Sequence, residues 1–169
     1  MKKIKIILLA LIVYSISFSE NNKYGFDFGA GIGYGNYNEL FFPIPTVSFY
    51  WFTEKRIHQL SSEIMAYRGY SENSYKDQLG FGLGYSCLYK LAIPSLYVGP
   101  TLGLYMYNST KAYGEGAQAV YGFGIKAASI WGAGKVRVKI DDRLLLGIDS
   151  EGVKYLLMNN FNISLILAL

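Results

Sequence analysis

The sequence predicts an all-β protein: an eight-stranded antiparallel up-and-down transmembrane β-barrel with a cleaved N-terminal signal peptide. Three observations lead to this fold class. The chain begins with a basic and then apolar leader, its remaining apolar residues recur with a period of two, and its connections alternate between long and short. These features indicate a chain that is exported and that crosses a membrane with strands.

The leader comes first. Three lysines within the first five residues precede an uncharged, mostly apolar run over 6–18, and small residues stand at −3 and −1 before Glu20. About 13 apolar residues are too few for a membrane-spanning helix, which needs about 20. We therefore predict a signal peptide over 1–19 and a mature chain over 20–169. No Cys lies at the cleavage site, so a lipoprotein anchor is not indicated.

Composition excludes several classes of protein. The 169 residues carry 16 basic and 12 acidic side chains, a formal charge of +4, and three of the basic ones lie in the leader. The mature chain is therefore nearly neutral, which gives no basis for nucleic-acid binding. Apolar residues make up 51% and charged residues 17%, which excludes a disordered chain, and a single Cys excludes a disulfide scaffold.

The predicted strands follow in order. From Tyr24 to Gly35 the even positions are apolar or aromatic, whereas the odd ones are Gly or Asp27. Successive strand residues point to opposite faces, so this segment is a two-faced strand. The alternation recurs at about 44–52, 58–68, 77–89, 95–107 and 117–131, in a strand that starts at 135, and in a last strand that ends at 169. The stretches 35–43, 69–76, 108–116 and 144–154 are expected to be long loops, and 53–57, 90–94 and 132–134 short turns.

The orientation of the apolar face separates two kinds of barrel. An eight-stranded interior is just wide enough for side chains. The polar face is mostly Gly, Ser and Thr, which fits such an interior, whereas the aromatic and branched residues of the other face would overfill it. Tyr24 and Tyr34 stand at the two ends of the first strand, as expected for residues at the two membrane interfaces. We therefore place the apolar face toward lipid; a soluble, exported lipocalin-like binding barrel is the alternative.

At this point the mature chain resembles the small eight-stranded outer membrane proteins of the OmpA transmembrane-domain and OmpX type. The last strand of that family has alternating apolar residues and usually ends in Phe; residues 161–169 keep the alternation but end in Leu169. The resemblance implies location in the cell outer membrane, contact with outer membrane lipid, and recognition by the barrel assembly machinery through the C-terminal strand. It also implies that the long loops face outward and the short turns face the periplasm.

Charged residues on the inward face predict an ion-pair cluster. A two-residue loop at Ala133-Gly134 would pair Gly132 with Lys135, and this register places Lys126 opposite Asp141. The predicted cluster consists of Asp27, Glu63, Lys126, Arg137, Lys139 and Asp141. It would close the lumen to diffusion; in the alternative, some of these charges reach water at a barrel mouth. Asp142, by contrast, is expected to point outward.

The sequence offers no catalytic, cofactor or metal site. Residues 29–35 are rich in glycine but lack the dinucleotide-binding spacing. His58 is the single histidine, and strand alternation points it away from Ser61 and Glu63, at the end with the short turns. Some eight-stranded outer membrane barrels are enzymes that modify lipid A. An outer membrane lipid-modifying enzyme is therefore an alternative, but we expect that this protein is not an enzyme.

The first long loop provides the candidate contact surface. Leu40, Phe41 and Phe42 form an apolar tip that either binds a surface ligand of unknown identity or dips into the outer leaflet. The expected role is therefore structural or interactive: envelope integrity, adhesion or surface interaction.

Overall fold

The computed structural model describes residues 23–35, 40–41, 45–71, 74–109, 116–132, 134–149 and 155–169. The predicted signal peptide lies outside these residues, and its boundary stays a prediction. The strands are β1 (Tyr24–Gly35), β2 (Leu40–Phe41), β3 (Pro45–Phe52), β4 (Arg56–Ser71), β5 (Ser74–Lys90), β6 (Leu96–Ser109), β7 (Gly116–Trp131), β8 (Val136–Asp149) and β9 (Tyr155–Ala168). In the described part of the chain, no helix is long and apolar enough to cross a bilayer.

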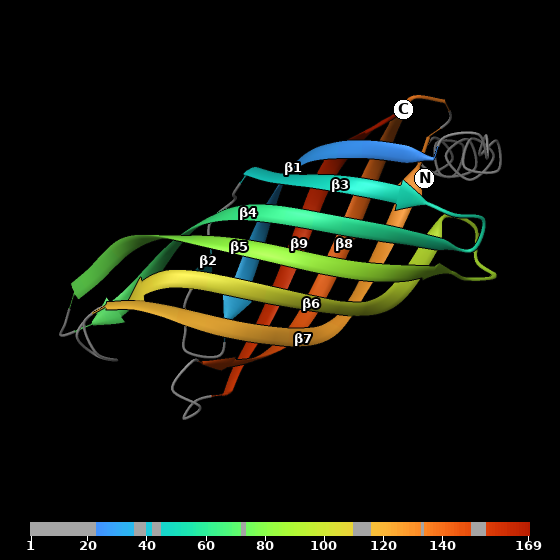
Figure 1. Ribbon diagram of the computed structural model, residues 1–169. Coiled ribbons are helices and arrows are strands. Elements are labelled where there is room, and N and C mark those ends of the chain that lie inside the picture. The colour runs from blue at the N-terminus through green and yellow to red at the C-terminus, as the bar shows by residue number, and fades with distance from the viewer. Residues whose placement is uncertain are drawn as a thin grey trace, which may run out of the picture.

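The strands form one closed antiparallel sheet (Figure 1). From β3 onward each strand pairs with the next, and β1 closes the barrel by pairing with β9 from Gly25↔Ala168 to Gly35↔Met158. β2 and β3 both pair with β1 and with β4, so they occupy one position in the wall, one after the other. The nine labelled strands therefore make an eight-stranded barrel, which confirms the predicted fold class.

The two ends of the barrel differ. Residues 53–55, 91–95 and 132–135 connect strands at one end, which also holds the start of β1 and the end of β9. We call this the short-turn end. Two of its turns lie side by side, because the amide of Lys90 donates to the carbonyl of Lys55 at 3.1 Å (Figure 1).

The strands are longer than the sequence pattern predicts at the opposite end. β4 and β5 pair from Arg56↔Tyr89 to Ser71↔Ser74, so most of the expected loop 69–76 is paired strand. β8 likewise continues to Asp149, through half of the expected loop 144–154. Residues 144–148 are apolar apart from Gly147 and continue β8, whereas the polar composition of 69–76 marks where the apolar band ends at β4 and β5. Backbone pairing continues beyond it, because a ladder of hydrogen bonds does not depend on side-chain polarity.

The turn between β7 and β8 is wider than predicted. Trp131 pairs with Val138 and Lys126 with Arg143, so the predicted pairings of Gly132 with Lys135 and of Lys126 with Asp141 are wrong by two residues. Gly132 and Gly134 have φ of 122° and 73°, a conformation that glycine adopts without a steric penalty. A shift of two residues keeps every side chain on its predicted face, because the strand period is also two.

Two prolines lie in the wall where a missing donor is tolerated. Pro45 is the first residue of β3. Pro100 lies in β6 where the β5–β6 ladder is interrupted, between the pairs Ser86↔Thr101 and Tyr89↔Val98. Neither proline therefore removes a hydrogen bond from a continuous stretch of ladder.

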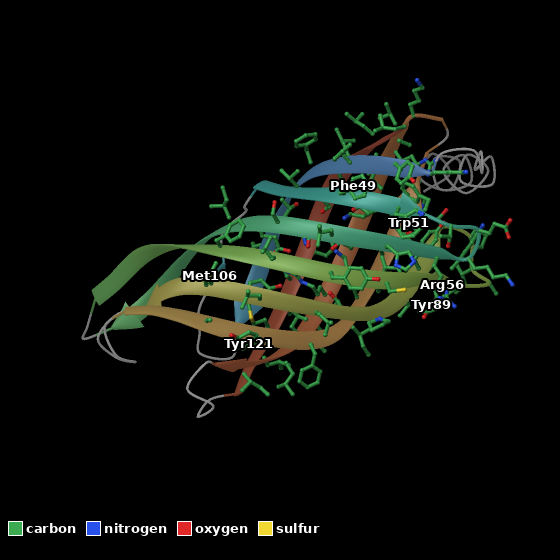
Figure 2. All side chains as sticks on the ribbon, in the orientation of Figure 1. Phe49, Trp51, Arg56, Tyr89, Met106 and Tyr121 are labelled. Carbon is green, nitrogen blue, oxygen red and sulfur yellow. The ribbon has the colours of Figure 1, made fainter. Side chains whose placement is uncertain are left out.

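Side chains alternate between an apolar outer wall and the lumen. Phe28 and Ile125 are 59% and 62% exposed on the outer wall, whereas Asp27 and Lys126 are buried inside. Figure 2 shows side chains such as Phe49, Met106 and Tyr121 directed away from the barrel axis. This orientation is opposite to that of a lipocalin-type barrel, whose apolar face points inward.

Candidate functional site

The lumen is layered from the short-turn end. Nearest to that end lies an apolar cluster, against which Phe52 packs; its members are Tyr50, Ile57, Leu88, Tyr97, Ala128, Ile130 and Ile166. The sequence pattern predicts small and polar residues throughout the interior, so it does not predict this cluster. A signal was present: near the short turns the alternation gives way to consecutive apolar residues, as in 50–52 and 130–131, which indicates that both faces are apolar there.

Above this cluster lies a group of four charges, which we call the four-charge group: Asp27, Lys126, Lys139 and Asp141. Lys139 Nζ lies 2.7 Å from Asp27 Oδ2 and 2.7 Å from Asp141 Oδ2, and Lys126 Nζ lies 3.0 Å from Asp141 Oδ1. All four side chains are almost completely buried. The group contains two cations and two anions, so its formal charge is zero. Each burial cost is offset by an opposite charge within contact distance.

Hydroxyl and amide groups complete the four-charge group. The Tyr50 hydroxyl donates to Asp27 Oδ2 and accepts from Lys139 Nζ at 2.5 Å. Ser164 donates to Asp27 at 2.9 Å, and the Asn162 amide lies 3.3 Å from Asp141 Oδ1. These residues come from five positions in the wall, so the group ties non-adjacent strands together across the interior.

Glu63 and Arg143 form a second, separate pair. Arg143 Nη1 and Nη2 donate to the two oxygens of Glu63 at 2.7 Å each, the bidentate geometry typical of strong guanidinium–carboxylate pairs. β4 and β8 lie on opposite sides of the barrel, so this pair spans the lumen. The Arg143 guanidinium also lies over the Tyr105 ring, 5.5 Å from its centroid.

Inward-facing glycines make room for these large side chains. A Cβ at Gly84 would lie 3.3 Å from Arg143 Nη1, and one at Gly103 would lie 2.5 Å from the Tyr105 ring. A Cβ at Gly82 would also meet that ring, at 2.8 Å. The glycines of the predicted polar face at 82, 84 and 103 therefore leave the space that Arg143 and Tyr105 occupy.

The structure brings together five of the six residues predicted for the lumen cluster, in two groups. Asp27, Lys126, Lys139 and Asp141 are in one, and Glu63 is in the other. The sixth, Arg137, is buried nearer the short-turn end. There its Nε donates to the Gly134 carbonyl at 3.3 Å and its guanidinium lies over the Phe52 ring.

Arg143 was missed because the sequence reading ended the strand too early. Residues 144–146 are three consecutive leucines, which interrupt the alternation, and the pattern therefore predicts a loop from 144. In the structure Leu144 and Leu146 are exposed and Leu145 is buried between them. The period of two continues, and counting it through the leucines would have placed Arg143 inside.

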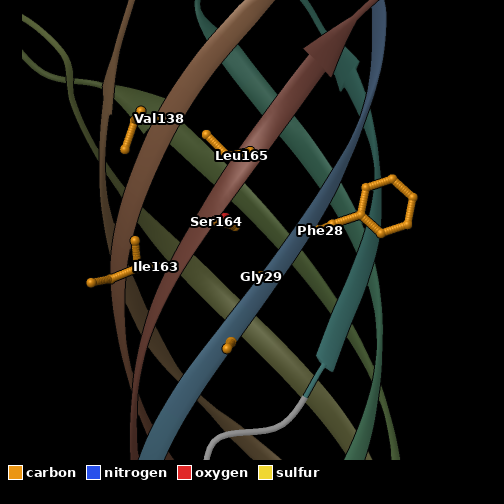
Figure 3. A pocket seen from close by; sticks show the side chains of 7 residues that line it. Phe28, Gly29, Val138, Ile163, Ser164 and Leu165 are labelled. Carbon is orange, nitrogen blue, oxygen red and sulfur yellow. The ribbon is translucent and has the colours of Figure 1, made fainter.

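A polar pair lies among apolar residues on the outer faces of β8 and β9. Asp142 is exposed, as predicted, and its Oδ1 accepts from the Asn159 amide at 3.1 Å. Around this pair the wall is mostly apolar, and a shallow groove of about 410 Å³ lies where β1 and β9 close the barrel. Phe28, Val138, Ile163 and Leu165 line this groove (Figure 3).

The remaining predicted residues are placed as follows. Leu40 and Phe41 form β2 and pair with β1 and β4, so they are not in an open loop; Phe42 lies outside the described residues. His58 points outward near the short-turn end, where its Nδ1 lies 2.8 Å from the Tyr85 hydroxyl. Among the described residues, no three His, Cys, Asp or Glu side chains are grouped as metal ligands.

The closed eight-stranded wall, its apolar exterior and its ionic interior define the architecture of a small outer membrane β-barrel. Neither a family model nor a curated relative matches the chain. Among solved structures, the chain is similar to Neisserial surface protein A (NspA), with a TM-score of 0.57 and 11% sequence identity over 86% of this chain and 96% of that one. At this identity the similarity concerns the fold.

Proposed function

We propose that this protein is an integral component of the outer membrane of a diderm bacterium, with a lumen that does not conduct, acting structurally or through its surface-exposed end. The observation that carries the proposal is the pair of opposite faces on each strand. Large apolar side chains cover the outside, and buried charges joined across the lumen occupy the inside. The proposed orientation places the short-turn end in the periplasm, as in the OmpA and OmpX type.

The side chains that occupy the lumen support the proposal that it is closed. The apolar cluster fills the short-turn end, the four-charge group lies above it, and the Glu63–Arg143 pair crosses the barrel above that. Tyr105, Val120, Leu145 and Met158 are buried on the far side of the pair. Opening a water-filled channel through the lumen would require separating buried, paired charges, which is unfavourable.

We further propose that the protein acts through contacts and not through catalysis. His58 contacts Tyr85 and Trp51 on the outer wall, and no described carboxylate or serine is bonded to it. Its partners would be outer membrane lipid, the barrel assembly machinery through β9, and a surface ligand at the end opposite the short turns. The function in envelope integrity, adhesion or surface interaction would reside at that end.

Cell fractionation with a heat-modifiability gel tests the location. We expect the protein in the outer membrane fraction, with a shift in gel mobility between unboiled and boiled samples. Recovery in the supernatant after high-speed centrifugation would instead support a soluble binder. Planar-bilayer recording of the refolded protein tests the lumen: we expect no stable conductance steps, and regular open-channel currents would contradict a closed interior.

A further inference from the structure

An aromatic and basic patch lies on the outer wall at the short-turn end. It consists of Trp51, Arg56, His58, Tyr85 and Tyr89, from β3, β4 and β5. The Trp51 and His58 rings are 5.4 Å apart, the His58 and Tyr85 rings 6.2 Å, and the Arg56 guanidinium lies 5.0 Å from the Tyr89 ring centroid. Figure 2 shows Trp51, Arg56 and Tyr89 gathered at this end.

The patch presents donors that the protein itself does not use. Hydrogen bonds between Thr53 and the backbone of Arg56 fix the turn from which Arg56 projects. Among the described residues, no carboxylate lies within ion-pair distance of its guanidinium. When the Tyr85 hydroxyl donates to Nδ1 of His58, the neutral imidazole carries its proton on Nε2 and can donate it outward. In this tautomer Arg56 and His58 both offer N–H groups on one surface.

The charge around the patch favours an anion. Near the short-turn end, the exposed charged side chains of the described residues are Lys23, Glu54, Lys55, Arg56, Lys90 and Lys135. Basic side chains outnumber acidic ones by five to one in this ring. Basic residues near a bilayer surface attract anionic lipids.

Directly beyond the patch the wall is apolar. Leu60 and Leu102 are each 57% exposed, and both are register partners of Tyr85. A lipid whose phosphate lies at Arg56 and His58 would therefore place its acyl chains along this surface. Aromatic side chains such as Trp51 and Tyr85 are typical of the level between headgroups and hydrocarbon.

We propose that Arg56 and His58, framed by Trp51, Tyr85 and Tyr89, bind the phosphodiester headgroup of an anionic phospholipid in the leaflet at the short-turn end. The patch combines a guanidinium, an imidazole and aromatic rings next to an apolar wall, which is the chemistry of a phospholipid and not of a free anion. The site is independent of any ligand bound at the opposite end of the barrel.

Trp51 is a built-in reporter for this site. The chain has two tryptophans, so Trp131→Phe leaves Trp51 as the single one. We would reconstitute this variant in vesicles of phosphatidylcholine and phosphatidylglycerol, with bromine on the acyl chains of one lipid at a time. We expect brominated phosphatidylglycerol to quench Trp51 fluorescence more than brominated phosphatidylcholine does. The difference should correspond to an enrichment of phosphatidylglycerol next to the patch of about fivefold over its share in the vesicle.

Substitutions separate a defined site from general attraction. In the Trp131→Phe background, Arg56→Gln and His58→Gln are expected to reduce the enrichment to less than about twofold. Lys135→Gln removes a cation of the same ring from the turn between β7 and β8, across the barrel from β4, and is expected to lower the enrichment much less than either patch substitution. Heat-modifiability of each variant verifies that the barrel is folded, and Arg56→Lys replaces Arg56→Gln if the latter does not fold. Equal quenching by the two lipids, or an equal loss with Lys135→Gln, would overturn the proposal.

Discussion

The two faces of β8 accommodate charge in different ways. Lys139, Asp141 and Arg143 point into the lumen, where each contacts an opposite charge from another strand. Asp142, between two of them, points to the outer wall and has the Asn159 amide as a partner. All four residues lie within five consecutive positions at similar depth. A charge on β8 is therefore tolerated where another side chain binds it, whatever its depth in the barrel.

Among the charges in the lumen, we expect the largest loss of stability on substitution of Lys139. Lys139→Met removes the cation that contacts both Asp27 and Asp141, and leaves two buried carboxylates with reduced compensation. We expect a loss of about 3–5 kcal/mol in the free energy of unfolding. Urea unfolding in lipid vesicles measures it. Lys135→Met, on the exposed turn, is the matched control and is expected to change stability by less than about 0.5 kcal/mol.

The Glu63–Arg143 pair tests how much stability depends on having a partner, because its two residues can be substituted singly or together. Glu63→Leu and Arg143→Met should each cost about 3 kcal/mol, since each leaves a buried charge unpaired. The double variant should be more stable than either single variant, because apolar side chains of similar size replace the whole pair. A double-mutant cycle measures this coupling. Additive losses would show that the two side chains do not interact in the folded barrel.

Introducing a cation on the outer wall tests whether this surface contacts lipid. Ile125 is 62% exposed in the apolar band of β7, and Ile125→Arg is expected to destabilise the folded barrel by about 2–4 kcal/mol in vesicles. Lys55→Arg in the turn before β4 is the control, with no measurable effect. A neutral result at position 125 would place this surface in water and contradict the membrane assignment.

Much of this architecture could be predicted from the sequence, because the period of two is a local property. Alternation at Phe26, Asp27 and Phe28 placed each side chain on the face where the structure has it. The register could not be derived in the same way. It depends on the length of the turn that contains Gly132 and Gly134, which shifts the pairing of β7 with β8 by two residues, and side-chain polarity does not encode this length.

The contacts within the lumen were harder to predict than its composition. Which charges meet depends on strand stagger, so Lys126 reaches Asp141 although its register partner is Arg143. The partition into two groups also depends on Tyr50, whose hydroxyl completes one of them. Alternation places Tyr50 on the inward face with Thr46 and Ser48, but it does not indicate which charges the hydroxyl contacts. Sequence identifies the inward charges, whereas three-dimensional geometry assigns their partners.

The smallest effect is expected at Asp142, where removing a charge should stabilise the protein. The residue lies six positions from the start of β8, which at about 3.3 Å per residue and a tilt of about 40° is roughly 15 Å along the barrel axis. That height is within an apolar band of about 25 Å, and Val138 and Leu144 on either side of it are exposed on the same wall. Asp142→Leu should therefore raise the free energy of unfolding in vesicles by about 1 kcal/mol, less than an arginine costs at such a site. Asn159→Leu is the matched variant: it leaves the carboxylate without its amide and should lower stability by a similar amount. If both substitutions stabilised the barrel equally, the Asp142–Asn159 bond would contribute nothing, and the outer face of β8 would tolerate a carboxylate without a partner.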